Sequence, residues 1–151
     1  MRTGMLLGAV LCLTAAARAD DDAAKKYLAG LEGTWKVASM KKAGQDLPAE
    51  FLKEFSVIIK GNTLTLKAGK EEDKAATLVV DPAQKPVSID MTPKDGPNAG
   101  KQVLGVISVD KDGVTMAWSD DKEGKTRPAD FTSTKDNRNF VMVLRKPEAG
   151  K

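Results

Sequence analysis

Alternation of apolar and polar residues over short segments is the feature that most constrains how this chain can fold. It is clear in TWKVASM, FSVIIK, TLTLK, TLVV, VSIDMT and VTMAWS, which lie between Thr34 and Ser119. A period of two puts every second side chain on one face, so each segment predicts a half-buried β-strand. Turn residues separate the segments, as in KGNT from Lys60 and DKDG from Asp110. Short strands at hairpin spacing predict an all-β protein, either a small barrel or a sandwich.

Other segments are less regular. QVLGVISVD and FVMVLRK are apolar at successive positions, so the pattern does not predict which of their residues face inward. FTSTKDNRNF predicts a weaker strand beginning at Phe131. LPAEFLKEF predicts a turn or two of helix, with Pro48 at the first helical position, where the missing N–H costs nothing.

The N-terminal segment predicts a secretory signal peptide over residues 1–19. Arg2 precedes an apolar run from Met5 to Ala16, and Ala17-Arg18-Ala19 forms an A-x-A cleavage motif. The run is shorter than the roughly 20 apolar residues of a membrane-spanning helix. Cys12 is the only cysteine, and no leucine stands three residues before it, which argues against a lipid anchor. We expect cleavage after Ala19, a secreted or periplasmic protein without a membrane anchor, and one domain over residues 20–151.

The start of that domain predicts a short helix from Asp20 to Gly33. Acidic residues at its beginning suit the positive end of the helix dipole. Tyr27, Leu28 and Leu31 share one face at helical spacing. The helix therefore leads directly into the first strand.

The joint between this helix and the first strand carries a resemblance. A helix, then Gly33-Thr34-Trp35 in LEGTWKV, then a series of strands resembles the lipocalin group of calycin barrels. In that group the tryptophan closes one end of the barrel, and an arginine of the last strand lies across its ring. The resemblance implies these closing roles for Gly33, Trp35 and Arg145. A guanidinium over an indole contributes about 0.5–2 kcal/mol.

A closer resemblance covers Leu31 to Lys146. LEGTWKV, LPAEF, IDMTPKDGPNAGK, LGVISVD, TRPADF and VLRK are similar to an uncharacterised lipocalin-like family that is widespread in planctomycete bacteria. It implies an antiparallel, up-and-down lipocalin-like barrel of eight or nine strands with a short N-terminal helix. The family has no established activity, so it implies no reaction for this chain.

Composition argues against several function classes. The sequence contains no histidine, which excludes Ser-His-Asp and Cys-His catalysis and histidine-based metal sites. GPNAGKQ lacks the spacing and the Ser/Thr of a phosphate loop, and SVDKDG lacks the final glutamate of a calcium loop. Lysines are interspersed with acids at a net charge of +3, without a basic stripe for nucleic acid. We expect no catalysis, cofactor, metal or nucleic-acid partner.

Two hypotheses for the function remain. The first is a barrel that binds a small apolar or amphipathic molecule. Its ligand would contact seven predicted interior residues: Val57, Ile59, Leu66, Ile89, Met91, Met116 and Trp118. The second is a non-catalytic scaffold or protein-interaction module with a filled barrel and an unidentified protein partner. In TRPADF, Arg127 and Asp130 are expected to pair and brace the loop, with a ligand role at the barrel mouth as the alternative. Pro128 and Phe131 are expected to lock the approach to the next strand.

Overall fold

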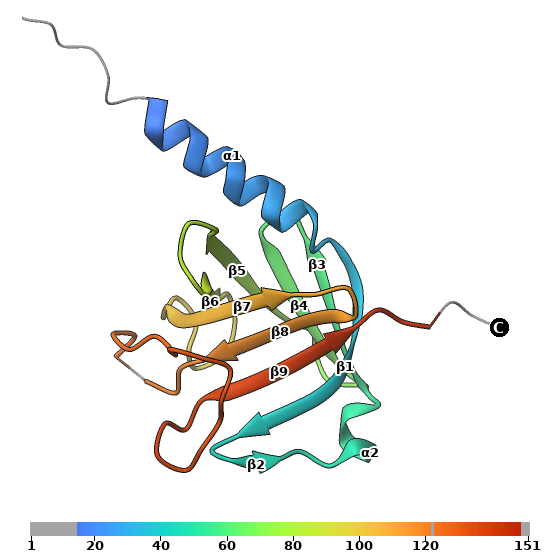
Figure 1. The fold of residues 1–151 in the computed structure, drawn as a ribbon. Helices are drawn as coiled ribbons and strands as arrows, with labels where there is room; N and C mark the ends of the chain where they lie inside the picture. Colours follow the sequence, from blue (N-terminus) through green and yellow to red (C-terminus); the bar gives the residue numbers. More distant parts are fainter. Residues whose placement is uncertain (1–14, 122, 149–151) are drawn as a thin grey trace, which may run out of the picture.

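The computed structural model describes residues 15–121 and 123–148 as a β-barrel with two helical segments (Figure 1). Nine antiparallel strands form one sheet in the order β2-β1-β3-β4-β5-β6-β7-β8-β9, and β1 also pairs with β9. That last pairing closes a barrel of eight strands, and β2 extends it beside the end of β1. The elements are α1 Ala15–Ala29, β1 Gly33–Lys42, β2 Gln45–Asp46, α2 Ala49–Leu52, β3 Phe55–Lys60, β4 Thr63–Ala68, β5 Lys74–Asp81, β6 Val87–Pro93, β7 Val103–Val109, β8 Gly113–Trp118 and β9 Phe140–Arg145. The predicted up-and-down barrel with an N-terminal helix is confirmed, but the helix covers Ala15–Ala29 and not the predicted range from Asp20 to Gly33, so Asp20 does not begin it.

The strand register places inward-facing residues of neighbouring strands next to one another around the barrel. Trp35 of β1 pairs with Val57 of β3, which pairs with Leu66 of β4. Opposite them, Met116 of β8 pairs with Met142 of β9. Because paired residues share a face, the alternation seen in the sequence becomes one apolar core inside the barrel.

The barrel has two distinct ends. At the α1 end, β1 begins, β9 ends, and three short connections join β3 to β4, β5 to β6 and β7 to β8. The C-terminal half of α1 packs there against β5, while its N-terminal end extends outward (Figure 1). At the α2 end lie α2, β2, residues 94–102 and a long β8–β9 connection. We call this connection, residues 119–139 without residue 122, the strap.

The strap replaces the strand that the sequence predicts from Phe131. No strand lies between Trp118 and Phe140 among the described residues. Side chains cap the backbone of this segment instead: Asn137 Oδ1 accepts hydrogen bonds from the N–H groups of Thr134 and Asn139. Such local bonds compete with strand pairing, which accounts for the wrong prediction.

The strap also explains the two segments that are apolar on both faces. Val106 of β7, Ala117 of β8 and Val141 of β9 point outward and are buried as a second, smaller cluster. Phe131 of the strap packs against them. Pro128, which lies in the same part of the strap, is also buried. These strands are apolar outside as well as inside because the strap covers them. No helix in the described residues is long and apolar enough to span a membrane.

Candidate functional site

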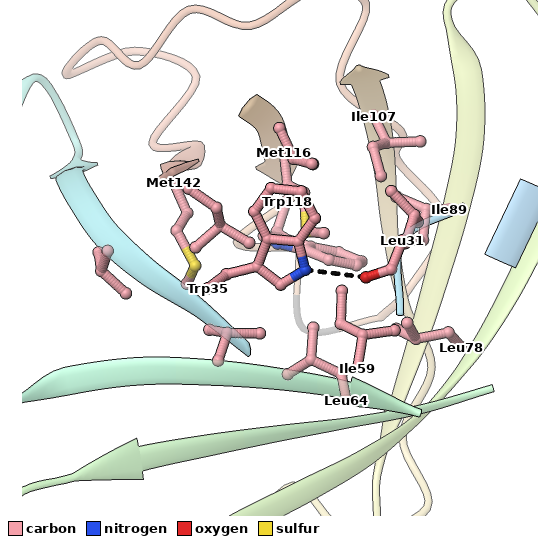
Figure 2. Close-up of a cluster of buried hydrophobic side chains, with 14 of the residues drawn as sticks. Leu31, Trp35, Ile59, Leu64, Leu78, Ile89, Ile107, Met116, Trp118 and Met142 are labelled. Carbon is pink, nitrogen blue, oxygen red and sulfur yellow. Dashed lines mark hydrogen bonds between the residues drawn. The ribbon is translucent and has the colours of Figure 1, made fainter. Parts of the chain in front are cut away.

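Trp35 and Leu31 close the α1 end of the barrel. Trp35 is 4% exposed and Leu31 1%. The indole Nε1 of Trp35 donates a hydrogen bond of 2.8 Å to the carbonyl oxygen of Leu31, as Figure 2 shows. A buried indole N–H needs such a partner, and the residue four positions earlier supplies it. The bond therefore fixes the α1–β1 joint and the end of the core together.

Gly33 shapes the same joint through its backbone. Its φ of +131° lies in a region that L side chains rarely adopt, while a Cβ there would meet no atom within 4 Å. The glycine is thus required for backbone conformation and not for space. Nearby, Glu32 Oε1 accepts a hydrogen bond of 3.0 Å from the N–H of Gly61, which ties the joint to the β3–β4 turn.

The cation over the Trp35 ring is Lys146, and the expectation for Arg145 is wrong. Lys146 Nζ lies 5.6 Å from the ring centroid. Arg145 pairs with Lys36 on β1 and follows Leu144, which is fully buried in the core, so its side chain points to the outer face. There it lies beside Gly113. Adjacent residues on a strand point to opposite faces, so the residue after Arg145, and not Arg145 itself, can reach the ring.

The seven predicted ligand-contacting residues all pack in the main core. Their burial differs along the barrel: Val57 is 0% exposed, Ile59 1%, Ile89 0%, Met116 0% and Trp118 4%, while Leu66 and Met91 are half-buried. A side chain that lines a void large enough for water exposes surface to it. The fully buried members therefore line no such void, and the access that remains lies at Leu66 and Met91, toward the α2 end.

Gly105 leaves the space in the core that the Trp118 side chain occupies. The two residues pair across β7 and β8, with both positions on the inner face. A Cβ on Gly105 would lie 2.5 Å from Trp118 Cε3 and 2.7 Å from the carbonyl oxygen of Ala117. The missing side chain makes room for the indole, which helps to fill the barrel (Figure 2). This pair was not recognised from the sequence, because alternation identifies inward positions and not their partners.

The α2 end carries an aromatic pair, of which Phe51 is exposed and Phe55 packs against the core. Phe51 is 56% exposed, and its ring centroid lies 4.9 Å from that of Phe55, at an interplanar angle of 47°. The next residue, Leu52, is buried in the core and anchors α2 on the barrel. A shallow groove of about 590 Å³ runs from this pair toward Gly69 and Lys70.

The strap is fixed to the barrel by Arg127, whose partner is Asp90 of β6. Arg127 forms a two-pronged ion pair with the Asp90 carboxylate, and Arg127 Nη1 also donates to the Gly105 carbonyl oxygen at 2.7 Å. Gln102 Nε2 donates to Asp90 as well. The expected Arg127–Asp130 pairing is therefore wrong. Asp130 accepts hydrogen bonds from the hydroxyl and N–H of Thr132.

The strap encloses a polar basin of about 700 Å³ at the α2 end, which we call the strap basin. Two of its carboxyls have a pKa below the ordinary value. The N–H groups of Glu123 and Lys125 lower the pKa of Asp121, and the Thr132 hydroxyl and N–H lower the pKa of Asp130. Both groups are ionised at neutral pH. This basin could not be predicted from the residue pattern, since its residues come together through turns within the strap.

Comparison with known proteins does not assign the chain to a family. A scan of family models, a search of curated proteins and a search of solved structures each found no match.

Proposed function

We propose that this protein is an exported, non-catalytic interaction module built on a filled lipocalin-like barrel, of the kind that the planctomycete resemblance implies. The observation that carries this proposal is the burial of the core: Val57, Ile89 and Met116 are each 0% exposed. An eight-stranded barrel is just wide enough either to be filled by its own side chains or to hold one small ligand. Full burial favours the filled alternative over a carrier of an enclosed apolar molecule.

The distribution of surface features supports recognition at the α2 end. The α1 end is closed by Trp35 and Leu31, which form part of the core. The α2 end presents the strap, α2 and the exposed ring of Phe51. Loops carried on a rigid scaffold are the usual location of binding surfaces.

A probe titration distinguishes the filled barrel from a ligand carrier. We expect the wild-type protein to take up no apolar fluorescent probe in its core. Met116→Trp adds volume to a core that is already packed, so it should lower the free energy of unfolding by about 1–3 kcal/mol. A denaturant melt of both forms measures this change. Uptake of one probe per chain, lost in a Met116→Trp variant of undiminished stability, would instead show a ligand-binding barrel.

Export is the second expected result. The A-x-A motif predicts a mature chain beginning at Asp20, and the α1 residues that pack on the core, Tyr27 and Leu28, lie beyond that point. Removal of residues 1–19 should therefore leave the barrel's stability unchanged. N-terminal sequencing of protein from the extracytoplasmic fraction measures the start of the chain. A cytoplasmic protein that retains Met1 would contradict export.

A further inference from the structure

The strap is attached to the barrel by few hydrogen bonds. Among the described residues, one backbone–backbone hydrogen bond joins the two, from the N–H of Ser119 to the carbonyl oxygen of Leu104. Ser133 Oγ accepts another bond, of 3.0 Å, from the N–H of Gly44 between β1 and β2. The other backbone–backbone bonds of the strap are internal to it. A segment with so few bonds to its surroundings opens at a low free energy compared with the strands of a core.

The strap takes no part in the main core. None of its described residues belongs to that cluster, and Phe131 packs instead on the outer face of β7, β8 and β9. The residues that border the strap, Trp118 and Phe140, pair with each other across β8 and β9. The barrel itself therefore holds the two ends of the strap together. The strap can move away without the loss of a strand pairing or of a contact in the main core.

The residues beneath the strap depend on it for their burial. We call them the outer cluster: Val106, Ala117 and Val141, which are 1%, 0% and 9% exposed. Their side chains point away from the core, to the face that an antiparallel sheet commonly turns toward solvent. Val79, an outward residue of β5, shows the contrast, because it is 60% exposed. The strap thus hides an apolar strip that makes no contribution to the main core.

Arg127 makes the strongest polar contact between the strap and the barrel. Its guanidinium group forms the two-pronged ion pair with Asp90 of β6 and also donates to the carbonyl oxygen of Gly105 of β7. The Asp90 side chain is only 15% exposed. The other ion pair between strap and barrel joins Asp120 to Lys42, at 4.0 Å and with the Lys42 side chain 54% exposed. Two-pronged pairs of this kind are stronger than single, exposed ones.

We propose that the strap is a cover that opens as one unit while the barrel stays closed, and that Arg127 holds it shut. Opening breaks the contacts of Arg127 with β6 and β7, moves Phe131 away and exposes the outer cluster. The main core and the β1–β9 pairing persist, because the strap contributes to neither. This inference goes beyond the proposed function, which rests on the filled core. It gives the protein two surfaces, a polar one when the strap is closed and an apolar one when it is open.

The test is the rate at which a thiol beneath the strap reacts with a soluble aromatic disulfide. A chain beginning at Asp20 contains no cysteine, because Cys12 is the only one in the sequence. Ala117→Cys places a thiol under the strap, and Val114→Cys places one on the core side of the same strand. We expect the first thiol to react at least about tenfold faster than the second, with a weaker dependence on urea, because opening the strap exposes less surface than unfolding does. Val141→Cys replaces Ala117→Cys if that variant does not fold.

The role of Arg127 is tested by a second substitution in the Ala117→Cys protein. Arg127→Gln should raise the labelling rate about tenfold, because the closed state alone loses the charge-assisted hydrogen bonds. The matched control is Lys125→Gln, which removes the same charge from a residue that pairs with Glu123 inside the strap and should leave the rate unchanged.

Three results would overturn the proposal. Equal rates and equal urea dependence for Ala117→Cys and Val114→Cys would mean that the strap opens only when the barrel unfolds. Labelling of Ala117→Cys as fast as in the unfolded chain would mean that the strap does not cover the outer cluster. Equal effects of Arg127→Gln and Lys125→Gln would mean that Arg127 does not hold the strap shut. The test of the filled core is separate, because its apolar probe reports on the inside of the barrel and the thiol on the outside.

Discussion

Trp35→Ala is expected to lower the free energy of unfolding by about 3–5 kcal/mol, as large deletions in a core do. The substitution removes an indole that is 4% exposed and also removes the donor to the Leu31 carbonyl oxygen. The α1–β1 joint then loses both its packing and its hydrogen bond. Urea denaturation followed by far-UV circular dichroism measures the change, because the signal does not depend on the deleted tryptophan.

Lys146→Ala and Trp35→Phe are the comparison variants for Trp35→Ala. Lys146 is exposed, so Lys146→Ala should cost at most about 1 kcal/mol, the range of an exposed cation–π contact. Trp35→Phe keeps most of the ring volume and should cost less than Trp35→Ala. A Trp35→Ala protein within 1 kcal/mol of the wild type would show that this end of the barrel does not depend on the indole.

Trp118→Ala is expected to destabilise the protein by about 3–5 kcal/mol and to open a cavity beside Gly105. No side chain at position 105 can fill the space, and the neighbouring Ile89 and Met116 are apolar. Apolar cavities of about 150 Å³ in other proteins stay dry and bind small apolar molecules. The variant should therefore gain about one probe-binding site per chain, which a fluorescence titration would detect.

The matched variant for Trp118→Ala is Trp118→Phe, which leaves a smaller space and should bind the probe more weakly. Destabilisation without probe binding in Trp118→Ala would mean that the surrounding strands collapse into the space. Probe binding that is equal in the wild type and in both variants would contradict a filled core.

Much of the fold could be predicted, because alternation directly reflects burial on one side of a strand. The inward residues of β3 and β8 follow the pattern without exception, as Val57, Ile59, Met116 and Trp118 illustrate. Alternation failed where a strand is covered on both sides. Val106 and Val141 are buried by the strap, and the strap itself has no periodic signal that would place Phe131 over them.

The candidate site was less predictable, because it depends on pairs that are distant in the sequence. Asp90 and Arg127 are 37 positions apart, and only the folded barrel brings the strap onto β6. The filling of the core likewise depends on Gly105 lying opposite Trp118. Sequence periodicity identifies faces, whereas register and turn geometry decide which residues on a face meet.

Because β1 pairs with β9, the barrel can close only when the first and the last strand of the sheet come together. Until β9 is in place, β1 and β8 each present an unpaired edge, and such edges invite association with other chains. Because the closing contact joins the two ends of the domain, its formation is slow relative to that of neighbouring hairpins. A chain truncated before Phe140 would lack the closing strand and retain both edges. The six-residue strand β9 thus determines when the chain stops being prone to aggregation.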